Sequence, residues 1–423
     1  MSARMPVITG IGVVAPTGVG VAEHWRNSLA GTARIAPISA PEPPAPTDGS
    51  ASSADRDLPI SVAGEVAGFT HTEFVANRLA VQTDRWTWMA LAATEMALTD
   101  ADLDPRREVP MDLSVVTASG SGGNAFGQRE IQALWRDGPR TVSAYQSIGW
   151  FYAASSGQIS IRHQLKGACG VLVADGAGGI DAVAQARRLI RRGSSAVVAG
   201  GTEAPLSPYA LACQSSVATL HRGADPALAY RPFAAGASGY VPGEGGAMLV
   251  LEAAHRARGR TARVYAEIAG TASTHDAHHP SEPAADHRQL ARAMRTALDR
   301  AGVSPDEIGV VFADGAGDPL GDRREAAAIS EVFGGRRVPV TVPKTMTGRL
   351  CSGAAALDLA WAALALRHDV VPPTVNVDPA DAAAAGLDLV TEAREGAGLR
   401  AALVVARGVG GFNAAAVLTA PAV

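Results

Sequence analysis

Short apolar runs rich in β-branched residues alternate with alanine-rich stretches along the whole chain. Apolar runs of this length, bounded by glycine or proline, are typical of buried strands. The stretches between them have the length and composition of helices. The alternation predicts an α/β architecture with buried sheets. We expect strands at residues 6–14, 112–118, 170–174, 196–201, 309–313, 338–343 and 402–407.

The most informative local pattern lies at residues 171–192. Residues 171–174 predict a strand, 175–179 (DGAGG) a flexible turn, and 180–192 a helix with apolar residues on one face and Gly193 as its stop. A strand, a tight glycine turn and a helix form the geometry that presents a nucleophile. A cysteine in that turn would lie at a helix N-terminus, which lowers its pKa. The turn contains no cysteine.

This turn has a similar counterpart later in the chain. Gly-Ala at 176–177 is followed by Ile180 and Asp181, and Gly-Ala at 353–354 is followed by Leu357 and Asp358. The offset is constant, as a duplication would produce. Two alanine-rich helices also resemble each other by chance, so duplication and coincidence both stay open on this match alone.

Length and charge narrow the class of protein. The chain has 423 residues, 47% of them hydrophobic, which is ample for a large core and two or three domain-sized units. A net charge of −4 without long runs of like charge argues against nucleic-acid binding. We find neither a signal peptide nor an apolar stretch of about 20 residues that would span a membrane. The proline-rich segment 39–59 predicts an exposed loop.

The cysteines and histidines suggest neither a disulfide framework nor a metal site. Cys169, Cys213 and Cys351 show no C-x-x-C spacing, which favours reduced thiols in a cytoplasmic protein. We expect each to be a small buried hydrophobe and not a nucleophile. The H-x-x-H-H cluster at 275–279 leads into a proline-containing segment, so a solvated loop is favoured over metal ligation.

Six motifs in sequence order resemble the ketosynthase family, which has a thiolase-type fold. They are 7–20 (VITGIGVVAPTGVG), 200–208 (GGTEAPLSP), 231–252 (RPFAAGASGYVPGEGGAMLVLE), 342–349 (VPKTMTGR), 371–375 (VPPTV) and 407–413 (RGVGGFN). Each motif is weak by itself, but the ordered set is specific. The resemblance implies a five-layer α/β/α/β/α sandwich built from two duplicated halves, at 1–255 and 256–423.

The resemblance also implies where condensation chemistry would reside. Ketosynthases use one cysteine nucleophile and two histidines, and the matching positions here are Gly176, Asp314 and Arg349. A glycine cannot hold the growing chain as a thioester. The two imidazoles normally stabilise the enolate formed by decarboxylation, and an aspartate would bring negative charge to that place. We therefore expect no independent condensing activity.

This pattern of losses resembles the chain-length factor, or ketosynthase beta subunit, of bacterial type II polyketide synthases. That resemblance implies a heterodimer with a ketosynthase alpha subunit, service to an acyl carrier protein, and no cofactor or metal. Chain-length factors usually carry glutamine where this chain has Gly176, so a decarboxylase role of that residue finds no support here. The alternatives are a malonyl-decarboxylating or self-sufficient ketosynthase, and a binding module outside polyketide synthesis.

Two groups of residues are expected to serve structure and chain length. Lys344 and Glu325 match a family pair that organises the back of the active site, and Lys344 is one of only two lysines among 37 basic residues. Asn124, Gly127 and Ile131 match the positions that gate the polyketide tunnel in relatives, where bulky aromatics are common. Their smaller side chains predict a roomier tunnel and a longer product.

The segment 143–163 is rich in aromatic residues and nearly uncharged. Such a segment is either a core helix or the apolar centre of a subunit interface, where aromatics concentrate. The resemblance favours the interface.

Overall fold

The computed structural model describes residues 4–38, 60–384 and 386–421, so the loop expected at 39–59 lies outside the described residues. The main sheet of these residues has 12 strands, eleven of them in one hydrogen-bonded path, with β2 (Gly18–Val19) paired to β1 alone. The path runs through β13 (Asp388–Leu389), β11 (Pro339–Thr341), β10 (Val310–Phe312), β15 (Ala401–Gly408), β16 (Phe412–Thr419), β9 (Ala266–His275), β1 (Pro6–Ala15), β8 (Gly245–Ala253), β7 (Ala196–Glu203), β5 (Leu113–Ala118) and β6 (Cys169–Leu172).

The sheet consists of two arms that meet at one short seam. Strands β1 and β9 are paired only through Val7 with Glu267 and Ile8 with Ala266, whereas β1 and β8 pair over most of their length. The first arm has the order β6-β5-β7-β8-β1, and the second has β11-β10-β15-β16-β9, with the two-residue strand β13 added outside β11. Without β13, the five strands of each arm, numbered in chain order, stand as third, second, fourth, fifth and first. The repeated topology confirms the duplication that the two glycine turns suggested.

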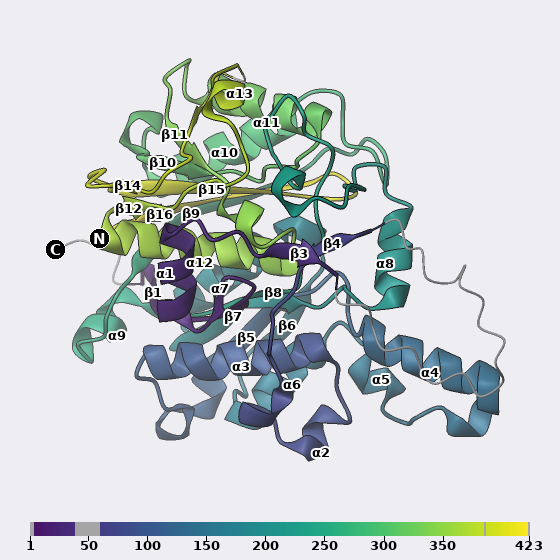
Figure 1. Cartoon of the computed structure of the whole chain (residues 1–423). Coiled ribbons are helices and arrows are strands. Elements are labelled where there is room, and N and C mark those ends of the chain that lie inside the picture. Colours follow the sequence, from purple (N-terminus) through teal and green to yellow (C-terminus); the bar gives the residue numbers. More distant parts are fainter. Residues whose placement is uncertain (1–3, 39–59, 385, 422–423) are drawn as a thin grey trace.

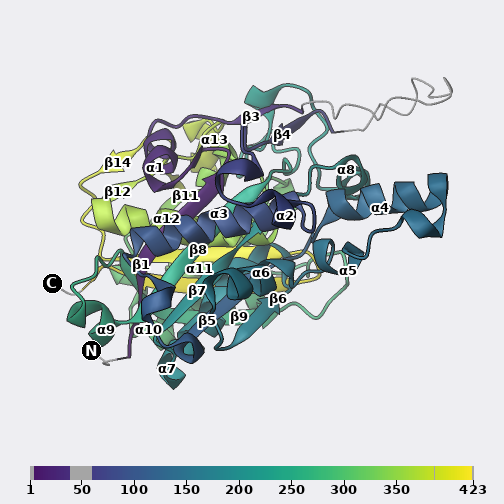
Figure 2. The same ribbon diagram turned by 90° about the horizontal axis from the view of Figure 1, so that it is seen from below.

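The two arms form separate layers with helices between and outside them (Figure 1). Helices α7 (Gly178–Arg192) and α12 (Ser352–His368) pack against each other in the middle, and their buried residues share one core with the inner faces of both arms. Helices α3 (Arg85–Asp100) and α6 (Ala154–His163) cover the first arm, and Figure 2 shows α3 crossing it. The expected five-layer thiolase-type sandwich is confirmed.

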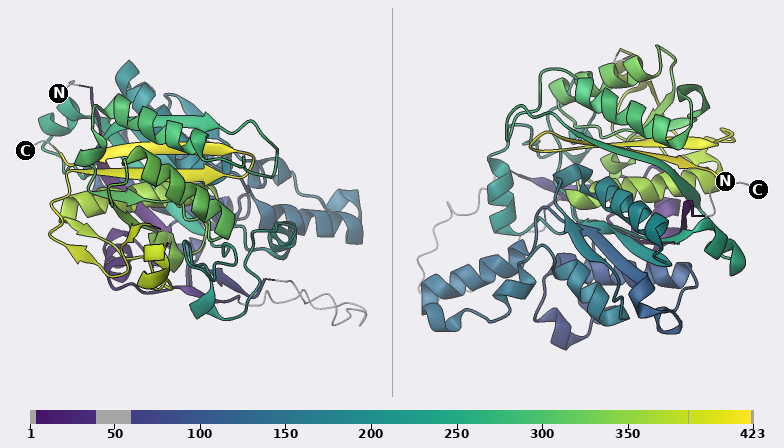
Figure 3. Two further views of the ribbon diagram at one scale, coloured as in Figure 1. Left: turned by 90° about the horizontal axis from the view of Figure 1, so that it is seen from above. Right: turned by 180° about the vertical axis from the view of Figure 1, so that it is seen from behind.

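The outer face of the second arm is covered by α10 (Arg288–Ala301) and α11 (Pro319–Val332), and α10 lies along β9 and β16 (Figure 3). The remaining elements are short or peripheral. They are α1 (Val21–Leu29), α2 (Asn77–Ala80), α4 (Asn124–Asp137), α5 (Gln146–Gly149), α8 (Pro208–Ser215), α9 (Ala254–Gly259), α13 (Pro379–Ala384), β3 (Ile35–Pro37), β4 (Val62–Gly64), β12 (Val370–Val371) and β14 (Arg394–Glu395). Helix α4 projects from the body of the molecule in all views.

The seven expected strands are present, with ends shifted by one or two residues. Three long strands were not expected, namely β8, β9 and β16. β9 contains glycine, threonine and serine, and β16 contains three consecutive alanines, so neither reads as an apolar β-branched run. β9 and β16 pair with each other over most of their length, and this pairing stabilises strands that local sequence preference does not predict. Across the described residues, no helix combines the length and apolarity needed to cross a membrane.

Candidate functional site

Gly176 lies buried in a tight turn between β6 and α7. The turn is sharp enough to place the preceding Asp175 at a φ of 44°, a left-handed conformation that non-glycine residues seldom adopt. A Cβ atom at position 176 would lie 2.4 Å from the carbonyl oxygen of Arg407 and 3.1 Å from Nη2 of Arg349. The expected strand–turn–helix geometry is therefore present, but a side chain at position 176 would require the Arg407 carbonyl to shift.

Arg349 and Asp314, which stand at the two histidine positions, form an ion pair with each other. Nη2 of Arg349 lies 3.3 Å from Oδ1 of Asp314 and also donates to the carbonyl oxygen of Arg407 at 2.8 Å. The backbone N–H of Arg407 donates to the same Asp314 oxygen at 3.0 Å. Together with Gly176, these residues form what we call the degenerate site: a buried charge pair in place of two imidazoles and a thiol.

The electrostatics of the degenerate site favour this fixed charge pair. Burial works against the positive charge of Arg349, but Asp314 together with Tyr230, Asp175 and Tyr240 outweighs it and holds the guanidinium pKa above its ordinary value. A guanidinium offers donors but no acceptor, and it does not lose its proton in proteins. Arg349 therefore cannot exchange a proton at neutral pH in the manner of a histidine. The sequence analysis treated Asp314 and Arg349 only as replacements of the two histidines. Their opposite charges could also have predicted that they form an ion pair.

Lys344 and Glu325, the expected structural pair, both hold the turn that carries Asp314. Nζ of Lys344 donates to the carbonyl oxygens of Ala313 and Asp314 at 2.7 and 3.2 Å. The Glu325 carboxylate accepts the backbone N–H groups of Asp314 and Gly315 at 2.7 and 2.8 Å. The two residues thus hold one turn from its carbonyl side and its N–H side without contacting each other directly.

The ion-pair partner of Lys344 is Asp358, whose Oδ2 lies 2.7 Å from Nζ. Both side chains are almost completely buried, which agrees with a compact ammonium contact at this position. Burial raises the pKa of Asp358 to about 6, with Lys344 opposing the shift. Sequence reasoning missed this partner, although Asp358 had been noticed as the repeat of Asp181.

A further buried carboxyl group lies beside the degenerate site. Glu203, at the end of β7, accepts backbone N–H groups of Gly120 and Ser121 through Oε1. Burial, with a smaller contribution from the charge of Asp175, raises its pKa to about 8. Glu203 is therefore protonated over most of the physiological range, and the sequence indicated it only as part of the GGTEA motif.

The cysteines are less buried than expected. Cys169 lies in β6 and Cys213 in α8, and both are exposed, so the prediction of buried hydrophobes was wrong for these two. β6 is the edge strand of its arm, and the exposed face of α8 carries Cys213. Cys351 caps α12 and is partly buried, and burial raises its thiol pKa well above the ordinary value. None occupies the position of Gly176.

The three residues expected to gate a tunnel lie on α4, where the structure brings them to one side of the helix. Asn124 begins the helix and its amide donates to Oγ of Ser121, so its polar group is satisfied within the chain. Gly127 is buried, and Ile131 is 47% exposed. The Trp150 side chain packs directly over Gly127, where an added Cβ would meet its Cδ1 at 3.0 Å. The sequence did not reveal this contact.

Large apolar side chains are exposed around α4 and the segment that follows it. Five exposed apolar residues form what we call the aromatic surface. They are the four aromatic residues Trp135, Tyr145, Trp150 and Phe151, together with Ile131. Between them, α5 and the chain around it form a short, irregular connection to α6. Exposed apolar groups gathered in this way usually mark an interaction site. Of the two readings of segment 143–163, the interface is favoured over the core helix.

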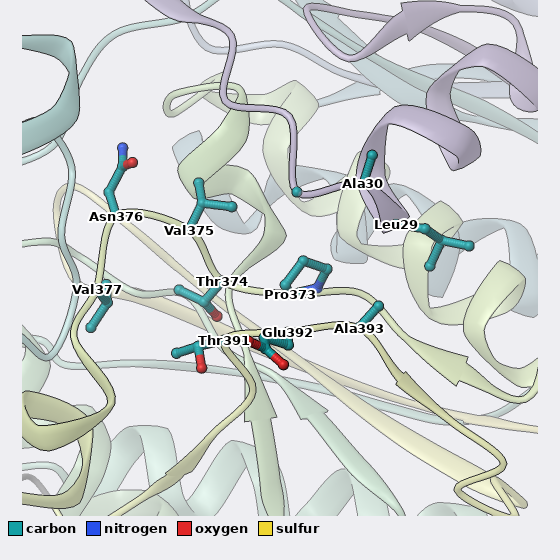
Figure 4. A pocket seen from close by; sticks show the side chains of 11 residues that line it. Leu29, Ala30, Pro373, Thr374, Val375, Asn376, Val377, Thr391, Glu392 and Ala393 are labelled. Atoms are coloured by element: carbon teal, nitrogen blue, oxygen red, sulfur yellow. The ribbon is translucent and has the colours of Figure 1, made fainter.

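A pocket of about 390 Å³ lies on another part of the molecule, between the end of α1 and the segments 373–377 and 391–393 (Figure 4). Its lining includes Thr374, Thr391 and Glu392 but no cysteine or histidine. Thr374 accepts the backbone N–H of Val342 at 2.8 Å, just before Lys344. The segment 373–377 thus contacts and stabilises the turn behind the degenerate site. Among the described residues, no three His, Cys, Asp or Glu side chains gather as a metal site requires.

A thiolase-type fold with a buried glycine in the turn before α7 and an Asp314–Arg349 ion pair beside it defines a ketosynthase-like class of protein. The family models agree with this class. Beta-ketoacyl synthase, N-terminal domain, matches residues 5–257, and Beta-ketoacyl synthase, C-terminal domain, matches residues 265–378.

Known relatives narrow the class further. The tetracenomycin polyketide synthase ketoacyl synthase beta subunit of Streptomyces glaucescens is 49% identical over 425 residues, which cover 99% of each chain. Among solved structures, the ishigamide ketosynthase/chain length factor matches with a TM-score of 0.88 at 27% identity, over 99% of this chain and 100% of that one. AntDE:AntF, a type II PKS acyl-carrier protein in complex with its ketosynthase bound to the hexaketide, matches with a TM-score of 0.85, 27% identity and the same coverage.

The chain therefore belongs to the beta-ketoacyl synthase family, among the ketosynthase beta subunits, or chain-length factors, of type II polyketide synthases.

Proposed function

We propose that this chain is a non-condensing chain-length factor, which pairs with a catalytic ketosynthase alpha subunit and shapes the tunnel that sets polyketide length. The observation that carries this is the closed nucleophile position at Gly176 in a chain that matches a ketoacyl synthase beta subunit along 99% of its length. The partner would perform the condensation on chains carried by an acyl carrier protein. That pairing is consistent with the ketosynthase/chain length factor and carrier-protein complexes of similar fold.

The aromatic surface supports the pairing. Its five members would be costly to leave in water, and obligate subunit interfaces of roughly 2,000 Å² or more resemble a domain core cut in half. We infer that the ketosynthase alpha covers this surface. The tunnel would then run along the face of α4 that carries Asn124, Gly127 and Ile131, with the polyketide entering from the partner.

Two organisational features belong to the same proposal. We assign the halves of the fold to residues 1–255 and 256–423, a boundary that falls between β8 and β9 and near the junction of the two family models. We also place the protein in the cytoplasm, where its carrier protein and partner would meet it.

The alternative of a self-sufficient or decarboxylating ketosynthase is disfavoured by the same contacts. A decarboxylase needs a donor for the developing enolate, and Nη2 of Arg349 is engaged by Asp314 and the Arg407 carbonyl. A glutamine at position 176, the usual residue of relatives, would need the space that Arg407 and Arg349 occupy.

Co-expression with a ketosynthase alpha and an acyl carrier protein tests the function. Light scattering should give one copy of each large subunit, and product mass should change with Ile131→Phe, because a larger side chain shortens a closed tunnel. The chain alone, incubated with an acyl-loaded carrier protein, should show no adduct by intact mass. A stable, condensing homodimer of this chain would overturn the proposal.

A further inference from the structure

The turn of α4 that holds Gly127 is bound rigidly to the segment that carries Trp150. The backbone N–H of Gly123 donates to the carbonyl oxygen of Trp150 at 3.2 Å. A Cβ atom at Gly123 would lie 2.0 Å from the carbonyl oxygen of Gly149, so the two backbones are in direct contact. On the other side, the ring of Phe126 packs onto Gly149. Trp150 therefore keeps a fixed position relative to α4 even though it belongs to a different, irregular segment.

The indole of Trp150 occupies the space that a side chain at position 127 would fill. An ideal Cβ at Gly127 would lie 3.0 Å from Cδ1, 3.7 Å from Nε1 and 3.8 Å from Cγ of Trp150. A separation of 3.0 Å is shorter than normal van der Waals contact, so even alanine would require the indole to shift by a few tenths of an ångström. The missing side chain of Gly127 thus gives no open space in the described structure, because Trp150 already fills it.

Trp150 is supported on one side and open on another. Its ring lies 5.9 Å from that of Tyr152, centre to centre, and it rests on Gly127. The side chain is nevertheless 44% exposed, on the same surface as Ile131. A rigid aromatic ring that is held from behind and open in front is suited to act as a wall. By contrast, Trp135 at the far end of α4 is 82% exposed and lacks such support.

We propose that Trp150 is a specificity-determining residue that forms the end wall of the tunnel, and that Gly127 acts only by making room for it. This inference rests on the proposed function, because it requires a polyketide to reach the face of α4. It replaces the expectation that small residues at the gate positions by themselves give a longer product. The wall position depends on the Gly127–Trp150 pair: a side chain at 127 would move the indole outward and shorten the tunnel.

The test uses the heterodimer with its native ketosynthase alpha and carrier protein. Trp150→Ala should raise the ratio of longer to shorter products about tenfold, because two additional buried carbon atoms are worth on the order of one decade in equilibrium constant. Trp150→Phe preserves an aromatic ring over Gly127 and should shift the ratio in the same direction but less, with the dimer intact. Met111→Ala, at an exposed apolar residue before β5 and outside the aromatic surface, is the control and should leave the product distribution unchanged. If the intact Trp150→Phe and Trp150→Ala dimers both make the parental distribution, the proposal is wrong.

A double-mutant cycle separates a wall from a merely structural tryptophan. Gly127→Ala should shift the distribution toward shorter products, since the added methyl group displaces the indole. In the Trp150→Ala background the same change should have little effect on length, because nothing remains to be displaced. Additive shifts would contradict the coupled pair.

Ile131→Phe distinguishes failure of this inference from failure of the proposed function. If Ile131→Phe shortens the product while the Trp150 variants do not lengthen it, the tunnel lies along α4 but Trp150 is not its wall. If no variant of Ile131, Gly127 or Trp150 changes the product, the tunnel assignment itself is wrong.

Discussion

The degenerate site buries charged side chains, whereas the aromatic surface exposes apolar ones. Each kind of side chain therefore lies in an environment that is energetically unfavourable for it unless a partner group compensates. The degenerate site buries charge: Arg349 and Asp314 lie inside the fold, and Lys344 with Asp358 lies just behind them. The aromatic surface exposes apolar rings, with Trp135 and Phe151 more than half accessible. The buried charges are compensated within the chain, by each other and by backbone carbonyls. The exposed rings find no such compensation in the described residues around α4.

This difference separates two kinds of region. At the degenerate site, the charged groups are paired and hydrogen-bonded within the fold, so that region is complete in one chain. At the aromatic surface, the fold is incomplete by itself and needs another surface to cover it. Changes at the degenerate site should therefore alter folding stability with little effect on pairing, and changes at the aromatic surface should do the reverse.

Lys344→Met gives the largest expected effect. It leaves the Asp358 carboxylate buried without its cation, and breaking a buried pair from one side typically costs about 3–5 kcal/mol. Urea unfolding of the heterodimer at fixed concentration measures the loss. Arg106→Met, which removes one member of an exposed ion pair with Asp104, is the control and should change nothing measurable. Equal stability of both variants would show that the buried pair has no structural role.

Glu203→Gln should change how stability depends on pH. The folded-state pKa of Glu203 is raised to about 8 from an ordinary 4.5, so its contribution is fully present below the ordinary value and is lost as pH rises through 8. Over that window the parent should lose on the order of 3 kcal/mol that the glutamine variant keeps. Asp322, Glu325 and Asp358 also have raised pKa values, about 8, 7 and 6, and contribute equally to both proteins.

Thermal melts of parent and Glu203→Gln at pH 5 and pH 8.5 provide the measurement for this pH effect. The two proteins should melt similarly at the lower pH, and the variant should melt at a higher temperature at the upper pH. Parallel pH profiles would contradict a protonated Glu203.

Phe151→Asp tests the opposite region. Placing a charge in the centre of an apolar interface should weaken pairing with the ketosynthase alpha by about 2 kcal/mol or more, roughly 30-fold in Kd. The melting of the isolated chain should hardly change, because Phe151 is 52% exposed there. Met111→Asp, at an exposed apolar residue before β5, is the matched control. Similar weakening by both variants would mean that the aromatic surface is not the interface.

The sequence predicted the fold well but not the contacts within the degenerate site. Ordered motifs and repeated glycine turns are local signals, so the α/β layers and the duplication could be predicted. The assignment of Gly176, Asp314 and Arg349 to the catalytic positions stays a prediction from the resemblance. The ion pair between Asp314 and Arg349, and that between Lys344 and Asp358, depend on segments brought together by the fold. The position of the Trp150 side chain over Gly127 depends on the path of an irregular segment. The sequence of that segment has no helix or strand periodicity from which its path could be predicted.

Gly176→Cys should add no condensing activity, which makes it the smallest expected change in function and the sharpest test of the degenerate site. The new Cβ would meet the Arg407 carbonyl at 2.4 Å and Arg349 at 3.1 Å. The Arg349 side chain can yield, but the Arg407 backbone carbonyl must shift, so the variant should lose the roughly 1–3 kcal/mol typical of overpacking. The thiol would lie at the N-terminus of α7, which favours a thiolate, yet the Asp314–Arg349 pair leaves no imidazole to stabilise an enolate. We therefore expect alkylation of the introduced thiol by iodoacetamide but no condensation without the partner.

Gly259→Cys, at an exposed position where an added Cβ meets no atom within 4 Å, is the matched control for thiol reactivity and stability. Efficient condensation by Gly176→Cys alone would show that the ion pair does not disable the site and that the glycine was the only barrier.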